Sequence, residues 1–184
     1  MKKFVLMLIG LFMAANVAVC QAEQVPLYER NAKDLYREIK LELEAIPTAN
    51  CKVKKFQRVS ELDDKDAKLK FWACDLLRKT DKRAKAKIMF AANGNSEVQY
   101  VLVCCGREIF EAEKSEMATM MLITSIGFLE VFGADEEELT AIVHDINENP
   151  SKGSWGILSD DTYFELEFGK DDKVAGFALR AYRE

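Results

Sequence analysis

The chain of 184 residues is 49% hydrophobic and 31% charged, and its formal net charge is −5. An acidic balance without an aromatic-rich basic stripe argues against nucleic acid as the partner, because proteins that bind nucleic acid present basic surfaces to the phosphates. The sequence also contains no internal repeat, no low-complexity tract and no Ser/Gly-rich linker. One compact domain is therefore the simplest organisation.

The beginning of the chain has the pattern of a secretory signal peptide. Lys2 and Lys3 precede an apolar run over residues 4–19, and small residues follow at Cys20 and Ala22. The run is shorter than the ~20 residues that a transmembrane helix needs. We expect cleavage after Ala22 and a periplasmic or secreted bacterial protein that is not integral to the membrane.

A lipid anchor at Cys20 is the alternative to ordinary cleavage. The residues before Cys20 resemble a bacterial lipobox, but Val19 stands where bacterial lipoproteins have Gly, Ala or Ser. This departure favours cleavage without lipidation. We therefore divide the chain into a signal peptide, residues 1–22, and a single domain, residues 23–184, which is long enough for one hydrophobic core.

Residues 27–46 have the apolar periodicity of an amphipathic helix. Leu35, Ile39 and Leu43 follow one another at intervals of four residues. Pro47 ends the pattern, as proline does at the end of a helix. We expect the apolar side of this helix to pack against the rest of the domain.

The pattern then changes to the alternation that is typical of strands. Between the last two of four such runs, Asn93 and Gly94 favour a tight hairpin, because both residues tolerate positive φ angles. We expect these runs to form a four-stranded antiparallel meander. The expected strands are residues 52–59, 66–77, 84–92 and 97–105.

Two helices and further strands are expected after the meander. The first helix, residues 108–132, contains a stretch from Met117 to Phe132 with one charge in 16 residues, so it should be buried on most sides. The second begins at Asp135, which forms a capping-box pattern with Glu138. The expected strands of the tail are residues 155–158, 162–168 and 174–182.

This order of elements predicts an α+β fold. We expect a mostly antiparallel sheet that is made of the four-stranded meander and the C-terminal hairpin strands. The N-terminal helix and the two central helices should cover the sheet, because their apolar sides need a surface to pack on.

Four cysteines remain after removal of the expected leader, and an even number in an oxidising compartment favours disulfides. If the first hairpin turns near Asp63 and Asp64, Cys51 faces Asp75 and lies within one position of Cys74. We therefore predict a Cys51–Cys74 disulfide at the open end of this hairpin.

Cys104 and Cys105 are adjacent in the fourth expected strand, so their side chains should point to opposite faces of the sheet. Three interpretations stay open. In the first, one cysteine of the pair forms a disulfide with another cysteine. In the second, both are buried thiols or form a strained vicinal disulfide. In the third, the pair forms a redox-active or soft-metal site. The Cys-x-x-Cys spacing that zinc and thioredoxin-type sites normally have is absent.

The sequence contains no motif for catalysis. His144 is the single histidine and lies beside the apolar stripe of a helix, where a structural role is usual. A Gly-x-Ser-x-Gly elbow and both glycine-rich phosphate motifs are missing, and no loop has the alternating oxygen ligands of a calcium site. We expect a protein that is not an enzyme and that has no cofactor.

Positive charge is concentrated in one part of the chain. From Lys52 to Ile88 there are 13 Lys and Arg against 6 Asp and Glu, whereas the rest of the expected mature chain is acidic. This segment suits a solvated strand face that discourages edge-to-edge aggregation. It also suits a patch for an anionic partner.

We expect the contact surface on the sheet face near Lys68, Lys70, Trp72 and Lys87, because an aromatic side chain among lysines can anchor a partner. The hypothesis is an exported, non-enzymatic envelope or secreted protein. It would bind an unknown protein, an anionic envelope component or a small ligand. The alternatives are a thiol-redox or soft-metal protein that acts through the adjacent cysteine pair, and a structural component of the envelope.

Overall fold

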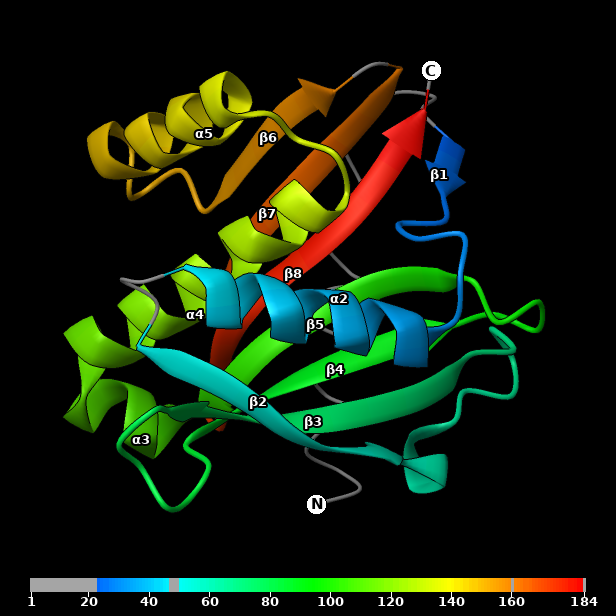
Figure 1. Cartoon of the computed structure of the whole chain (residues 1–184), viewed down its shortest axis with the longest axis horizontal. Helices are drawn as coiled ribbons and strands as arrows, with labels where there is room; N and C mark the ends of the chain where they lie inside the picture. The colour runs from blue at the N-terminus through cyan, green and yellow to red at the C-terminus, as the bar shows by residue number, and fades with distance from the viewer. Residues whose placement is uncertain (1–22, 47–49, 160, 184) are drawn as a thin grey trace.

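The computed structural model of the chain describes residues 23–46, 50–159 and 161–183. The expected signal peptide and the alternative lipid anchor at Cys20 lie outside these ranges. Within them, the chain forms an antiparallel sheet of eight strands and four α-helices (Figure 1). The predicted α+β class is therefore confirmed.

All neighbouring strands of the sheet run antiparallel. The sheet order is β2-β3-β4-β5-β8-β7-β6, and β1 pairs with the end of β8. The predicted meander is thus present, and the C-terminal strands join it where β8 pairs with β5. The strands are β1 (Glu23–Val25), β2 (Cys51–Arg58), β3 (Lys70–Arg78), β4 (Ala86–Ala92), β5 (Val98–Gly106), β6 (Ser154–Ser159), β7 (Thr162–Lys170) and β8 (Val174–Arg183).

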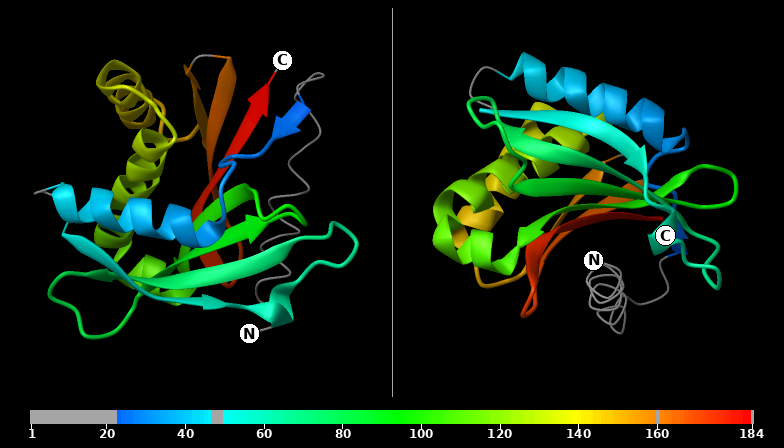
Figure 2. Two further views of the ribbon diagram at one scale, coloured as in Figure 1. Left: turned by 45° about the vertical axis from the view of Figure 1, so that its right-hand side comes forward. Right: turned by 90° about the horizontal axis from the view of Figure 1, so that it is seen from below.

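The described helices pack against one face of this sheet, and Figure 2 shows α2 and α4 on the same side of it. The expected helix over residues 108–132 is two helices, because the backbone leaves the helical region at Glu113 (φ −129°, ψ 39°). A short 3-10 helix, η1 (Ser60–Leu62), lies in the first hairpin loop. The α-helices are α2 (Ala32–Ala45), α3 (Arg107–Ala112), α4 (Lys114–Val131) and α5 (Glu136–Glu148).

The start of α2 is fixed by Asn31, which the sequence pattern did not indicate. Its side-chain oxygen accepts hydrogen bonds from the backbone N–H groups of Lys33 and Asp34 at 3.0 and 3.1 Å. This N-cap satisfies donors that have no partner within the helix. The fully buried side chains of α2 are Leu35, Ile39 and Leu43.

Helix α4 is buried on most sides, as its lack of charge predicts. Phe128 is fully buried and packs edge-to-face against Phe90 of β4, with ring centroids 6.1 Å apart. Gly127 lets α4 approach α2, since a Cβ atom at this position would lie 3.3 Å from Ile39 Cδ1. In the described parts of the chain, no helix is long and apolar enough to cross a bilayer.

The register of β2 and β3 contradicts the predicted Cys51–Cys74 disulfide. Cys51 pairs with Arg78, so Cys74 lies four positions away along β3. Four strand residues span roughly 13 Å, whereas a disulfide needs Cα atoms within about 7 Å of each other. Both side chains are buried free thiols.

The prediction was wrong because the first hairpin does not turn symmetrically about Asp63 and Asp64. Its loop contains η1, and the pairing of β2 with β3 shifts between Lys54 and Gln57. Lys55 has a positive φ of 58° at this irregularity, which is typical of a bulge. The turn lies between Asp64 and Leu69, which bridge each other, and this later turn displaces Cys51 from Cys74 along the sheet.

An ion pair between Arg58 and the titratable carboxylate of Asp63 holds the loop of the first hairpin. Asp63 accepts hydrogen bonds from both Nη1 and Nη2 of Arg58, each at 2.6 Å. These bonds hold the pKa of Asp63 below its ordinary value. A lowered folded-state pKa stabilises the protein above the ordinary Asp range, and this contribution is lost as the pH falls through and below that range.

We therefore expect Asp63→Asn to lower the free energy of unfolding by about 1 kcal/mol at neutral pH, since the pair is only partly buried. The difference from the wild type should vanish in acid, where Asp63 itself is protonated. Urea denaturation at several pH values measures both effects. Asp66→Asn in the same loop is the control and should have no effect, because the Asp66 carboxylate has no hydrogen bond or ion pair with any described residue. An equal loss at all pH values would contradict the assignment.

The second hairpin lies where Asn93 and Gly94 predict it, but its loop differs from the tight turn. The Asn93 side-chain oxygen accepts hydrogen bonds from the backbone N–H groups of Asn95 and Glu97 at 2.9 and 3.1 Å. The residue with positive φ is Ser96 (70°) and not Gly94. The Asn93 side chain, rather than a two-residue turn, therefore organises this loop.

Candidate functional site

The sheet has apolar side chains on both of its faces. The face toward the helices forms the main core together with residues of α2, α3, α4 and α5. We name the opposite side the second face, and its ten buried apolar residues the second-face cluster. These residues are Leu62, Leu69, Phe71, Ala73, Met89, Ala91, Leu102, Cys104, Val174 and Ala178.

The strand register aligns the middle of the second-face cluster in a row. Ala73 pairs with Met89, and Met89 pairs with Leu102. Leu102 in turn pairs with Ala178. Neighbouring strands lie ~4.8 Å apart, so this row is roughly 14 Å long. A continuous apolar track therefore crosses the second face from β3 to β8.

None of the described α-helices contributes to the second-face cluster. Apart from strand residues and Leu69 beside β3, its only member in the described ranges is Leu62 of η1. The larger side chains are nonetheless buried, with exposed fractions of 0% for Phe71 and 1% for Leu102. The helix layer therefore does not account for the burial of this face.

One end of the apolar track carries positive charge. Lys87 pairs with Asp75 across the strands, and its Nζ atom lies 2.8 Å from the Asp75 carboxylate; Lys55 approaches the same carboxylate at 3.4 Å. Burial alone would raise the pKa of Asp75, but the two ammonium groups outweigh it and leave this pKa below its ordinary value. Two cations thus share one carboxylate.

A hollow of about 480 Å³ adjoins this positive end. Five lysines line it, against Asp75 and Asp81 as the acids, so its charge is positive. The Lys52 ammonium donates a hydrogen bond to the backbone oxygen of Lys79, which turns it toward the chain. The lysines that line the hollow are Lys52, Lys54, Lys55, Lys79 and Lys82.

The other end of the track is acidic. Arg180 of β8 is buried and lies 2.9 Å from Glu167 and 3.9 Å from Glu165. Glu165 also accepts hydrogen bonds from Ser154 Oγ at 2.8 Å and Tyr182 OH at 3.2 Å. The second face is therefore apolar in the middle, positive toward β2 and negative toward β7.

The structure does not bring the predicted contact residues together on one face. Lys87 points to the second face, whereas Trp72 packs partly buried against the main core. Lys70 shares the face of Trp72, because the two residues are two positions apart in β3. Lys68 lies outside the strand with a positive φ of 54°. Trp72 contacts a cation within the chain, since Arg58 lies 4.7 Å from its ring centroid.

Sequence reasoning missed the second-face cluster, although a signal for it exists. Residues 86–92 and 98–106 are apolar at nearly every position, rather than at alternate positions. Such continuous runs are typical of strands that are buried on both faces. An antiparallel sheet whose second face is solvated would instead alternate apolar and polar residues.

The adjacent cysteines point to opposite faces, as alternation predicts. Cys104 belongs to the second-face cluster and Cys105 to the main core. Burial raises the pKa of Cys104 to about 12 and that of Cys105 to about 11. Redox and metal chemistry require the thiolate. The raised pKa values keep these two thiols protonated at neutral pH, and their side chains point in opposite directions.

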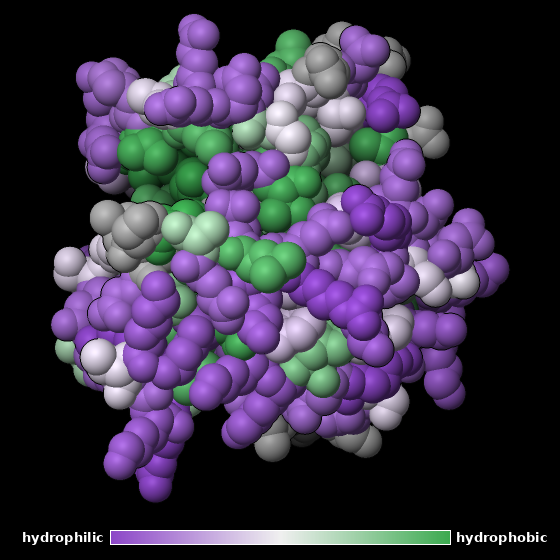
Figure 3. Space-filling model, in the orientation of Figure 1, coloured by the Kyte–Doolittle hydropathy of each residue, from purple (hydrophilic) through white to green (hydrophobic). Residues whose placement is uncertain are grey.

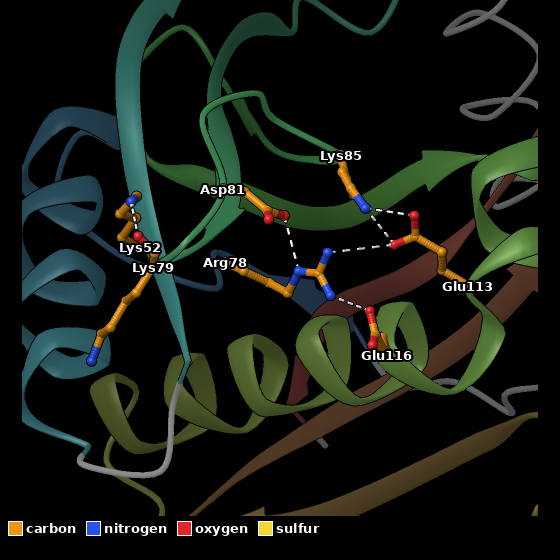
Figure 4. A network of polar contacts seen from close by, with 7 residues as sticks. All are labelled: Lys52, Arg78, Lys79, Asp81, Lys85, Glu113 and Glu116. Atoms are coloured by element: carbon orange, nitrogen blue, oxygen red, sulfur yellow. Dashed lines mark hydrogen bonds and ion pairs between the residues drawn. The ribbon is translucent and has the colours of Figure 1, made fainter.

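A polar network closes the end of β3 against α3 and α4 (Figure 4). Arg78 bonds to Asp81 at 2.9 Å, to Glu116, and at 3.9 Å to Glu113. Glu113 also accepts two hydrogen bonds from Lys85, at 2.5 and 2.6 Å. The hydrogen bond from Arg78 holds the pKa of Asp81 below its ordinary value. The side chains of Arg78, Asp81, Lys85, Glu113 and Glu116 all have partners among themselves, so these contacts join the hairpin to the helices.

A small cavity of about 280 Å³ lies beside this network, and Cys51 is among its lining residues. Burial raises the pKa of the Cys51 thiol, although a hydrogen bond with Thr124 opposes the shift. In the described ranges, no group of three or more His, Cys, Asp and Glu side chains is placed to hold a metal ion. On the helix side, the surface is mostly hydrophilic, with apolar atoms visible beneath α5 (Figure 3).

The fold and the site define a class: an α+β protein whose antiparallel sheet carries a helix layer on one face and an apolar track with charged ends on the other. Comparison with protein-family models, with curated proteins and with solved structures found no significant match. The function is therefore argued from the geometry of this surface.

Proposed function

We propose that the chain is an exported, non-enzymatic binding protein of the bacterial envelope or the extracellular space. Its ligand surface is the second face of the sheet. The pattern of Lys2, Lys3 and the apolar run over residues 4–19 supports export. The apolar track between two charged ends supports ligand binding at this face.

The observation that carries the proposal is an apolar track to which the described helices contribute no residue. Large contiguous apolar surfaces on globular proteins are sites of contact with a ligand or a partner. A chain processed after Ala22 begins at β1, and its described helices pack in the main core. We expect its second face to be available to a ligand, since no described α-helix packs on that face.

The alternative of a thiol-redox or soft-metal protein has weaker support. The chemistry would need the Cys104 and Cys105 sulfur atoms on one side of the strand, and they lie in different clusters. A purely structural role in the envelope would require no ligand and makes no use of the charged ends of the track.

The proposal predicts that processing changes the accessibility of Cys104. In the protein isolated from the exported fraction, with a mass that matches a start at Glu23, a maleimide should modify Cys104 without denaturant. Cys51, Cys74 and Cys105 face the main core and should stay protected, which makes them internal controls. Peptide mass mapping identifies the modified sites.

The unprocessed chain is the comparison, and Cys104 should be protected in it, because the second-face cluster is buried. Protection of Cys104 in the processed protein as well would remove the ligand surface on which the proposal depends. An intact, unprocessed product in the cytosol would remove the expected export.

A further inference from the structure

We propose that the ligand of the second face is a monomeric fatty carboxylate. Its acyl chain lies along the apolar track, and its carboxylate binds the lysines at the β2–β4 end. This inference rests on the proposed function and names the chemistry of the ligand.

The apolar track has the shape that an extended acyl chain needs. Ala73 and Ala178, which have short side chains, stand at its two ends. Leu102 and Met89 lie between them and provide the larger apolar contacts. Burial of an alkyl chain favours binding in proportion to the apolar area that leaves water, so a row of this length supports binding of an acyl chain.

The positive end of the track carries more lysine charge than its carboxylate neutralises. Lys55 and Lys87 share the single carboxylate of Asp75, which leaves one positive charge in excess. Lys54, the neighbour of Asp75 across β2 and β3, is exposed, and it forms no ion pair with any described residue. An incoming carboxylate can therefore accept hydrogen bonds from ammonium groups without displacing Asp75.

The charge at the opposite end fixes the direction of the ligand. Glu165 and Glu167 carry two negative charges against the one positive charge of Arg180. A carboxylate placed there would be repelled, and a cationic head placed beside Lys54 and Lys87 would be repelled as well. The face therefore selects an anionic head at the β2–β4 end.

The test uses the processed protein and three amphiphiles with the same alkyl chain, each below its micelle concentration. These are dodecanoate, dodecyltrimethylammonium and dodecyl maltoside, and calorimetry measures their affinities. Dodecanoate should bind most tightly and should protect Cys104 from maleimide, since Cys104 pairs with Lys87. Equal affinity for the neutral or the cationic amphiphile would overturn the inference but leave the ligand surface in place.

Two variants locate the head and the chain. Lys54→Gln together with Lys87→Gln should weaken dodecanoate about tenfold and leave dodecyl maltoside unchanged. Lys70→Gln is the control for the loss of a lysine, because it makes the same substitution at one exposed residue of the helix face. Leu102→Asp should abolish binding of all three amphiphiles, and near-UV circular dichroism verifies that each variant is folded.

Further outcomes decide the inference. An unchanged affinity of the double lysine variant for dodecanoate would overturn it. So would co-sedimentation of the protein with anionic phospholipid vesicles in the absence of any binding of monomeric dodecanoate, because the ligand would then be a membrane surface. The proposed function fails separately, if Cys104 is inaccessible in the processed protein.

Discussion

Gly176→Ala is expected to lower the free energy of unfolding by about 3 kcal/mol or to prevent folding. Gly176 lies in β8 opposite Cys104 of β5. A Cβ atom at this position would lie 2.5 Å from the backbone oxygen of Val103 and 2.8 Å from Cys104 Cα. Because these are backbone atoms, the clash is relieved only by moving the two strands apart, and overpacking of this kind costs ~1–3 kcal/mol or more.

Gly94→Ala is the matched control for this prediction. Nothing lies within 4 Å of a Cβ atom at Gly94, and its φ is not positive. The substitution should therefore change the unfolding midpoint in urea only slightly. A Gly176→Ala protein as stable as the Gly94→Ala protein would show that β5 and β8 do not approach each other as closely as described.

Phe128→Ala should cost about 3–5 kcal/mol of unfolding free energy. Phe128 is fully buried, and its ring packs against Phe90 of β4 and stacks on Phe132, with centroids 6.1 and 5.9 Å apart. Its loss leaves a cavity where α4 meets the sheet, which the surrounding side chains fill only in part. Leu41→Ala on α2 is the control, since Leu41 is 67% exposed and should change stability by less than about 0.5 kcal/mol.

Guanidinium chloride denaturation followed by far-UV circular dichroism measures both changes. A loss at Phe128 no larger than that at Leu41 would mean that α4 does not form the centre of the main core. The same measurement checks whether unfolding is a single transition, on which the comparison of free energies depends.

Much of the fold follows from local patterns in the sequence. Three such patterns depend only on residues a few positions apart in the sequence, and the structure contains each of them. They are the apolar stripe of α2, the capping box of Asp135 and Glu138, and the alternation in the strands. The break at Glu113 and the bulge at Lys55 were not predicted, because neither position has a glycine or proline to indicate it. The Cys51–Cys74 disulfide prediction was wrong because the first hairpin turns between Asp64 and Leu69, later than the turn about Asp63 and Asp64 that the prediction assumed.

The candidate site was less accessible to sequence reasoning than the fold. The segment from Lys52 to Ile88 was identified as basic, but the choice of Lys70 and Trp72 assumed that the polar side of β3 is the surface for a partner. In fact the apolar residues Phe71 and Ala73 point to the second face. The track also joins β3 to β8 across the sheet, and a pairing over such a sequence separation has no local signature.

The last strand of the chain lies in the interior of the sheet, because β8 pairs with β1, β5 and β7. Until Val174–Arg183 has been synthesised, β5 has no partner on that side and the C-terminal hairpin has nothing to join. The sheet of an emerging polypeptide therefore stays in two separate parts until β8 has left the ribosome.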